Sequence, residues 1–182
     1  MKWLFFSLLF LGSLAKADDL DVTVAGPDKQ GVYQVQGYME ADASTSVAWN
    51  VLTDYNHMSE FLPSITSSTI SGTNDGVLLV RQTFVAKFLF FNHSADALFE
   101  IILIPNLNSV SFTDVLHNDF IECTGIWSIV SMNGHSGIIY NVKIIPSVDA
   151  PHWIVRSVSR KMAVTLLAQL RKEMERRNKE GL

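Results

Sequence analysis

The histidines are the first side chains to consider for acid–base or metal chemistry, because imidazole titrates near neutral pH and is the commonest metal ligand. No two of them form an H-x-x-x-H pair with a glutamate at the spacing of a metalloprotease helix. They are His57, His93, His117, His135 and His152. His93, His117 and His135 fall in expected turns, where a solvated polar side chain is the ordinary case. The pattern predicts no metal site and no cofactor.

Motifs for nucleophilic or nucleotide chemistry are also missing. The sequence has no P-loop and no G-x-G-x-x-G, and Gly134-His135-Ser136-Gly137 differs from the G-x-S-x-G of a nucleophile elbow. The single cysteine, Cys123, excludes an intrachain disulfide and a Cys-rich metal site. We therefore assign no catalytic residue.

Two polar residues interrupt strand faces that are otherwise apolar. Gln82 lies in the alternation that includes Phe84, and Asp114 lies between Phe112 and Leu116. An unpaired carboxylate is costly to bury, so such a group is hydrogen-bonded, reaches water at the open end of a strand, or has a function. One hypothesis is that Gln82 or Asp114 orients the polar head of a bound ligand. The alternative is an end-of-strand position in contact with water.

The strands that carry these residues are predicted by alternating apolar and polar positions separated by turn sequences. The segments are 31–41, 65–72, 77–90, 94–104, 109–116, 120–131 and 136–146. Asn133-Gly134, between the last two segments, is the strongest hairpin signal, because a type I′ turn needs positive φ twice. We expect a seven-stranded antiparallel meander.

One face of this sheet is expected to be apolar and rich in aromatic side chains. On 120–131 the inward set is Ile121, Cys123, Gly125, Trp127 and Ile129. The inward sets of the neighbouring segments are Leu78, Val80, Phe84, Ala86, Phe88 and Phe90 on 77–90, Ala95, Ala97, Phe99, Ile101 and Leu103 on 94–104, and Ile138, Tyr140, Val142 and Ile144 on 136–146. The aromatic residues expected to line a pocket are Phe84, Phe88, Phe99, Trp127 and Tyr140. Leu89 and Phe91 add apolar groups to the outer face, which suggests an edge covered by a helix, a dimer contact, a transient membrane contact or packing under the N-terminal segment.

Helical spacing predicts two short helices and one long one. Ser44-Thr45-Ser46 is expected to supply the N-cap of a helix over 47–52, and Asp54 is expected to cap a second helix over 55–62. Residues 152–178 contain no proline or glycine and carry an apolar stripe. The stripe comprises Val155, Val158, Met162, Leu166, Leu170 and Met174, and Ala163 and Leu167 widen it. The fold class is therefore α+β, with the stripe of the long C-terminal helix packed against the apolar face of the sheet.

The N-terminus has the layout of a secretory signal peptide. Met1-Lys2 is followed by an apolar run over 3–14 and by the small-x-small site Ala15-Lys16-Ala17. We expect cleavage near Ala17 and a periplasmic or secreted protein; an uncleaved N-terminal anchor is the alternative. The expected organisation is a signal peptide over 1–17, an N-terminal extension over 18–30, one folded domain over 31–178 and a tail over 179–182.

Composition and charge narrow the class of partner. Of the 182 residues, 48% are hydrophobic and 18% charged, which excludes a disordered or low-complexity chain. Removal of residues 1–17 would leave 12 basic and 18 acidic residues, a net charge of −6. Because nucleic-acid binding depends on neutralisation of phosphates by Lys and Arg, we expect no nucleic-acid partner.

Several short motifs resemble one family. Val47-x3-Val51-Leu52-x-Asp54-Tyr55 and Phe61-Leu62-Pro63, with Gly125-x-Trp127, Tyr140 and Pro146…Pro151-x-Trp153, resemble the polyketide cyclase/dehydrase branch of the START/SRPBCC superfamily. That branch includes the coenzyme Q-binding proteins. The similarity spans about residues 31–177. It implies a helix-grip fold, in which a curved sheet grips the long C-terminal helix.

The resemblance also implies a function, because proteins of this superfamily hold lipids, sterols, polyketides or quinones between sheet and helix. We expect binding of a hydrophobic small molecule, with the aromatic residues above as its lining, although the same residues also suit a fully packed core. A cyclase or dehydratase using the same cavity is an alternative, in which Asp114, Glu122 or Tyr140 would supply acid–base groups. A protein-interaction module without a ligand is the third possibility.

Overall fold

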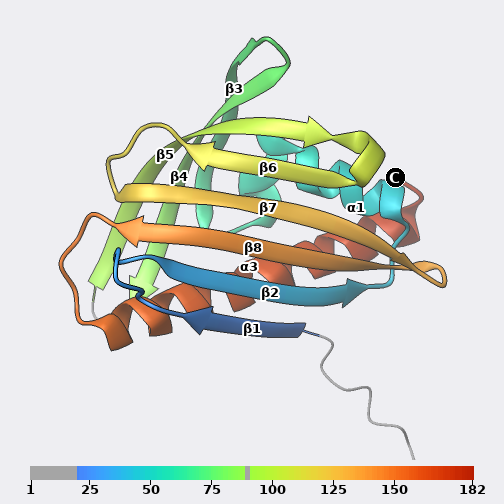
Figure 1. The fold of residues 1–182 in the computed structure, drawn as a ribbon. Helices are drawn as coiled ribbons and strands as arrows, with labels where there is room; N and C mark the ends of the chain where they lie inside the picture. The colour runs from blue at the N-terminus through green and yellow to red at the C-terminus, as the bar shows by residue number, and fades with distance from the viewer. Residues whose placement is uncertain (1–19, 89–90) are drawn as a thin grey trace, which may run out of the picture.

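A single antiparallel sheet forms the body of the protein. The computed structural model describes the backbone of residues 20–88 and 91–182, and the side chains of these residues except 86–93. The described strands are β1 (Leu20–Ala25), β2 (Tyr33–Ala41), β3 (Ile65–Asn74), β4 (Val77–Phe88), β5 (Phe91–Ile104), β6 (Ser109–Asp114), β7 (Phe120–Met132) and β8 (His135–Pro146). Their order is β1-β2-β8-β7-β6-β5-β4-β3, and the sheet curves around the long helix (Figure 1).

The prediction of seven strands was wrong by one. Residues 20–25, which we had placed in an N-terminal extension, form β1 and pair with β2 from Leu20 opposite Met39 to Ala25 opposite Gln34. Burial explains the additional strand, because Val22 is only 3% exposed and belongs to the core. Apolar and polar residues alternate over only six positions here, so the pattern was too short to be recognised as a strand after the apolar segment over 3–14.

The strands also do not form a simple meander. Each strand from β3 to β8 pairs with the next one in sequence. β2 does not pair with β3, which forms the opposite edge of the sheet, but with β8. The chain crosses from β2 to β3 through three short helices, α1 (Thr45–Thr53), η1 (Tyr55–His57) and α2 (Met58–Phe61). This crossover places the short helices over the same concave face that the long helix covers (Figure 1).

Two local predictions have different outcomes. Ser44 caps α1 as expected, since its Oγ accepts a hydrogen bond from the Val47 amide at 3.2 Å. Asp54 does not cap η1 with its side chain; its backbone carbonyl accepts from the His57 amide instead. Its carboxylate is thereby left free for the contacts described below.

The face assignments follow the period of the strands except at one position. Val80, Phe99 and Ile101 are buried as expected, but Ile121 is 62% exposed. A register shift between Phe120 and Glu122 in the β7–β8 ladder inserts one residue and turns Ile121 to solvent. The predicted Asn133-Gly134 hairpin is confirmed, with φ of 46° and 93° at the two residues.

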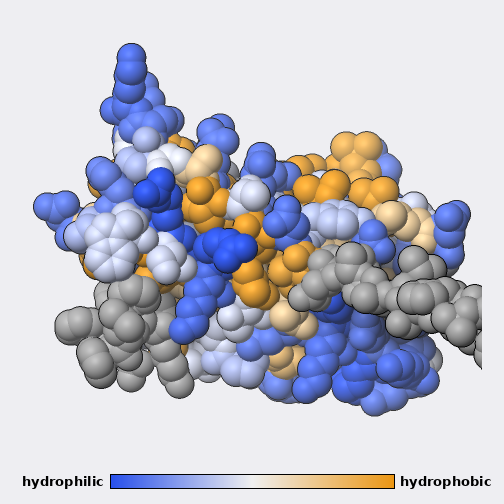
Figure 2. All heavy atoms as spheres, turned by 90° about the horizontal axis from the view of Figure 1, so that it is seen from below, coloured by the Kyte–Doolittle hydropathy of each residue, from blue (hydrophilic) through white to orange (hydrophobic). Residues whose placement is uncertain are grey.

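The long helix α3 (His152–Glu180) extends two residues beyond the predicted end. Its buried positions include Val155, Ala163, Leu167, Leu170 and Met174, which face the sheet as the apolar stripe predicted. Seen from below, the molecule is mainly hydrophilic, with hydrophobic residues gathered toward the middle of this side (Figure 2). The stripe is therefore the side of α3 that meets the core.

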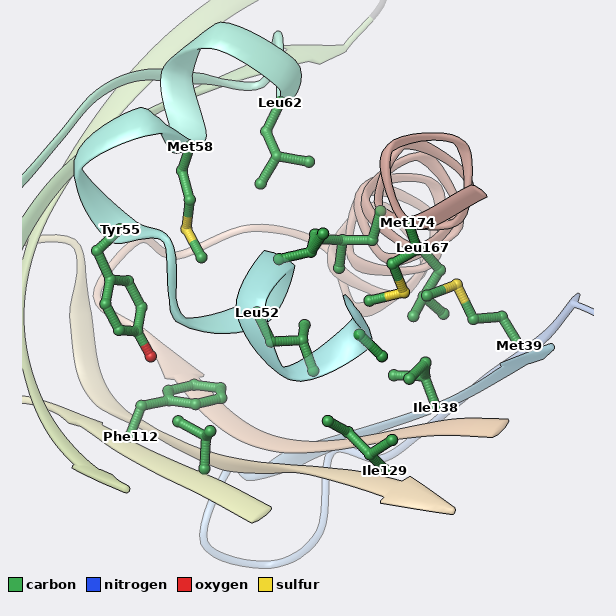
Figure 3. Packing of buried hydrophobic residues seen from close by; sticks show 14 of the residues in the cluster. Met39, Leu52, Tyr55, Met58, Leu62, Phe112, Ile129, Ile138, Leu167 and Met174 are labelled. Atoms are coloured by element: carbon green, nitrogen blue, oxygen red, sulfur yellow. The ribbon is translucent and has the colours of Figure 1, made fainter. Parts of the chain in front are cut away.

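The core lies between α1, α3 and the half of the sheet nearest β2. Met39, Ile138, Leu167 and Met174 are each less than 2% exposed and pack against one another there (Figure 3). In the described part of the chain, no helix has the length and apolar character that crossing a membrane requires.

A cavity between the sheet and the helices

A row of aromatic rings crosses the concave face of the sheet. Phe84 on β4 contacts Phe99 on β5 edge-to-face at 6.0 Å between ring centroids, and Phe99 contacts Phe112 on β6 at 5.5 Å. Phe112 in turn stacks with Tyr140 on β8 at 6.4 Å, and Tyr140 stacks with Trp127 on β7 at 4.1 Å. Edge-to-face and stacked contacts are both favourable for aromatic pairs, so the rings of this row stabilise one another's positions.

The contact between Phe112 and Tyr140 depends on Gly125. Phe112 pairs with Gly125 across the β6–β7 ladder, and Tyr140 lies on the next strand. A Cβ at Gly125 would lie 2.5 Å from Phe112 Cζ and 2.7 Å from the carbonyl oxygen of Asn141. The missing side chain is what lets the Phe112 ring reach over β7.

A partly enclosed cavity of about 90 Å³ lies between this row and the helices. The short helices and the chain that follows them supply one wall, α3 supplies another, and the sheet supplies the floor. The lining residues are Leu52, Tyr55, Met58, Leu62, Ile65, Gln82, Phe84, Phe99, Ile101, Phe112, Trp127, Tyr140, Leu166 and Leu170. Figure 3 shows Tyr55, Met58 and Leu62 on the helical side and Phe112 on the sheet side.

The volume limits what can enter without rearrangement. A cavity of about 150 Å³ is known to accept one benzene molecule. At about 90 Å³ this cavity is smaller, so even a single aromatic ring has to shift lining side chains or extend through the open side. Leu166 and Phe84 are only half-buried and border this space, so they are the side chains with room to move.

Five of the seven predicted ligand-binding residues line the cavity: Gln82, Phe84, Phe99, Trp127 and Tyr140. The side chain of Phe88 lies outside the described residues, as do those of Leu89 and Phe91. The seventh, Asp114, is completely buried but does not belong to the lining.

Asp114 has a structural explanation. Its Oδ1 accepts hydrogen bonds from the amides of Leu98 and Leu116, and its Oδ2 accepts from the amide of His117. Three backbone donors are sufficient to compensate a buried carboxylate, so Asp114 stabilises the end of β6 and its junction with β5. The interpretation of Asp114 as a group that orients a ligand is therefore not supported by its position.

Gln82 is held firmly at the cavity wall. It is 6% exposed, and its Nε2 donates to Ser68 Oγ at 2.9 Å and to Met58 Sδ at 3.3 Å. The amide connects β4 to β3 and to α2. Its carbonyl oxygen accepts no hydrogen bond from the residues that the structure describes.

The helical wall was not predicted from the sequence. Leu52, Tyr55, Met58 and Leu62 all fall within the segment that carries the Asp54-Tyr55 and Phe61-Leu62-Pro63 motifs, which we used only for the family resemblance. Tyr55 is 6% exposed, and burial raises the pKa of its phenol well above the usual range. Burial raises the pKa of Tyr140 in the same way. Both hydroxyls therefore stay neutral at physiological pH.

An ionic network joins the helical wall to the end of α3. Arg177 Nη2 donates to Asp54 Oδ2 at 2.8 Å and its Nε donates to Glu173 Oε1 at 2.7 Å. The guanidinium also lies 5.2 Å from the ring centroid of Phe61, a cation–π distance. His57 Nδ1 lies 2.6 Å from Asp54 Oδ1. The network therefore fixes η1 and α2, which form one wall of the cavity, to α3.

The network sets the protonation of its carboxylates. Burial alone would raise the pKa of Asp54, but hydrogen bonds from His57 and Arg177 outweigh it and hold the pKa below the usual value. A hydrogen bond from Arg176, opposed by burial and reinforced by Arg177, lowers the pKa of Glu173. Folding stability from these groups is therefore present at neutral pH and is lost as the pH falls through the lowered pKa values.

The described residues contain no cluster of side chains suited to binding a metal ion. No group of three or more His, Cys, Asp or Glu side chains lies close enough together to hold an ion there.

We predict that Gly125→Ala lowers the free energy of unfolding by about 1–3 kcal/mol, because the new methyl group would collide with the Phe112 ring and a backbone carbonyl. Urea denaturation measures the loss, and near-UV circular dichroism reports the disturbed aromatic row. Gly72→Ala is the matched control, because its Cβ would meet only Leu79 Cδ1 at 3.8 Å. Equal stability of the two variants would contradict the packing described.

We predict that Arg177→Gln lowers the free energy of unfolding at pH 7 by about 1 kcal/mol, because it removes the link to Asp54. The difference from the unmodified protein should shrink below about pH 4, as Asp54 and Glu173 become protonated. Arg176→Gln is the control, since Arg176 forms ion pairs with Glu173 and Glu180 on its own helix. Urea denaturation across pH 3–8 measures both; a pH-independent difference would contradict the ionic assignment.

Comparison with solved structures shows the fold. The Zhui aromatase/cyclase from Streptomyces sp. R1128 is 14% identical, with a TM-score of 0.68, over 80% of this chain and 95% of that one. A START superfamily protein from Mycobacterium smegmatis is 17% identical, with a TM-score of 0.67, over 82% and 99%. A STAR-related lipid transfer protein from Xanthomonas axonopodis is 15% identical, with a TM-score of 0.69, over 87% and 94%. No curated protein matches the sequence.

The sequence itself matches a family model. The model for "Polyketide cyclase / dehydrase and lipid transport" covers residues 41–171, from the end of β2 to the last third of α3. This range contains the helical wall, the aromatic row and most of the α3 stripe. The chain therefore belongs to the polyketide cyclase/dehydrase and lipid transport family and has the helix-grip fold of the START/SRPBCC superfamily.

Proposed function

We propose that the protein binds a hydrophobic small molecule, such as a lipid, a quinone or a polyketide-like compound, in the cavity between the sheet and the helices. The observation that carries the proposal is the lining, in which every residue except Gln82 is aliphatic or aromatic. Burial of apolar area is worth about 25 cal/mol per Å², so about 200 Å² of ligand surface would contribute about 5 kcal/mol. Family membership supports the same function.

The arrangement of polar groups supports a carrier over a cyclase or dehydratase. Acid–base chemistry would need a proton donor and an acceptor facing the ligand. Of the candidates from the sequence, Asp114 and Glu122 are outside the lining, and only Tyr140 belongs to it. A protein-interaction module would leave this apolar cavity without a role.

We further propose that the protein acts outside the cytoplasm, after removal of residues 1–17. The layout of the first 17 residues supports this, and β1 begins at Leu20, so cleavage after Ala17 would leave every described element intact. A periplasmic or secreted carrier of this kind would shield its ligand from water between membranes or cells.

Filling the cavity tests the binding proposal. We predict that Ile101→Phe weakens the affinity for N-phenyl-1-naphthylamine, an uncharged fluorescent probe, at least tenfold, because Ile101 is 3% exposed and borders the cavity. Ile102→Phe is the matched control, since the neighbouring side chain faces away and is 48% exposed. Leu166→Trp, on the half-buried side of α3, gives a second filled cavity without altering the sheet.

Two measurements decide whether this is the site. Probe binding that survives both filling substitutions would place the bound molecule elsewhere. Native mass spectrometry and organic extraction of the unmodified protein, purified from its own compartment, should show a co-purifying lipid-like molecule; its loss in both filled variants supports the proposal.

Export has a separate test. We predict that the full-length chain, expressed in a Gram-negative host, is recovered from the periplasm with a mass that corresponds to a start at Asp18. Ala17→Phe should block cleavage, because signal peptidases need a small residue there. Ala25→Phe, beyond the expected site, is the control for processing. A mature protein that begins at Met1 would contradict the assignment.

A further inference from the structure

Two tyrosine hydroxyls on the cavity wall lack hydrogen-bond partners in the described part of the protein. The chain has four tyrosines. The two outside the cavity are bonded: Tyr33 Oη lies 2.8 Å from His152 Nδ1, and Tyr38 Oη donates to Glu40 Oε1 at 2.8 Å. The two that line the cavity, Tyr55 and Tyr140, make no such bond within the described residues.

The positions of these two tyrosines are fixed by packing. Tyr55 lies in η1 and is 6% exposed, and Figure 3 shows its hydroxyl end pointing toward Phe112. Tyr140 stacks between Phe112 and Trp127. The two phenols therefore approach the Phe112 region from the helical side and from the sheet side. The Tyr140 ring cannot turn without losing these stacking contacts.

Tyrosine hydroxyls in a protein interior normally find a hydrogen-bond partner. The hydroxyls of Tyr55 and Tyr140 are not fully enclosed by protein atoms, and both residues line the cavity, so a partner can reach them from there. Gln82 adds a third free polar atom, because its amide nitrogen is used by Ser68 and Met58 while its carbonyl oxygen has no donor in the described region. The wall thus offers two neutral donors and one neutral acceptor.

The lining of the cavity carries no charged side chain, which disfavours a ligand with a charged end. No Arg, Lys or His side chain is among the lining residues of the described structure, and neither is an Asp or Glu. An anionic head would be buried without a compensating cation, and a cationic head without a carboxylate. A pure hydrocarbon would leave both phenols unbonded.

We propose that the ligand inserts an uncharged, oxygen-bearing end, a carbonyl or a hydroxyl, whose oxygen accepts hydrogen bonds from Tyr55 and Tyr140. The inference rests on the proposed binding function and specifies the chemistry of the inserted end. The aromatic row and the aliphatic residues then hold the rest of the ligand. Gln82 is placed to accept a hydrogen bond where that end is a hydroxyl.

Three single-ring probes that differ in one group test the proposal: acetophenone, its isostere α-methylstyrene, in which a methylene group replaces the oxygen, and benzoate. Ligand-observed NMR titration measures their affinities for the unmodified protein. We expect acetophenone to bind roughly tenfold more tightly than α-methylstyrene, because it adds up to two net hydrogen bonds. Benzoate should bind more weakly than acetophenone.

Tyr55→Phe and Tyr140→Phe locate the effect. Each should weaken acetophenone binding roughly threefold or more and leave α-methylstyrene binding unchanged, since the ring remains. Tyr33→Phe, a buried tyrosine outside the cavity, is the matched control and should change neither.

The outcomes separate this inference from the proposed function. Equal binding of acetophenone and α-methylstyrene, both lost on cavity filling, would overturn the hydrogen-bond inference and leave the hydrophobic site intact. The same holds if both tyrosine variants bind acetophenone as the unmodified protein does. Failure of both uncharged probes to bind would overturn the inference together with the proposed site.

Discussion

The structure depends on how the concave face of one curved sheet is covered. Eight strands present more apolar surface than a single helix can bury, and an exposed apolar face of that size is unfavourable in water. α3 covers the part near β1 and β2, where Met39, Leu167 and Met174 pack without space between them. The crossover helices cover the remainder less closely. The cavity is the volume between these two coverings.

Polar groups near this volume fall into two kinds. Asp114 and the Gln82 amide nitrogen are satisfied by the protein and fix strands β3 to β6 to one another and to α2. The phenols of Tyr55 and Tyr140 are rigidly placed but unsatisfied within the described residues. In a low-dielectric interior the satisfied groups stabilise the fold, whereas the unsatisfied phenols can still form hydrogen bonds with a bound molecule.

Much of the fold follows from local sequence, because alternation, helical spacing and the Asn-Gly turn are local signals. The inward faces of β4, β5 and β8 and the stripe of α3 were predicted correctly for this reason. Ile121 was assigned to the wrong face because a register shift depends on the partner strand. Asp114 looked like a ligand group because its three amide donors come partly from β5, which is distant in sequence. Tyr55 was missed because only the crossover brings η1 over the sheet.

The ion pair between Asp54 and Arg177 joins residues 123 positions apart. During synthesis, the crossover helices emerge long before the final turns of α3, so for most of translation their acidic anchor point has no cation to meet. The crossover helices can therefore be joined to α3 by this ion pair only when nearly the whole chain has been synthesised. Premature termination before Arg177 would remove the link and leave the cavity wall held by packing alone.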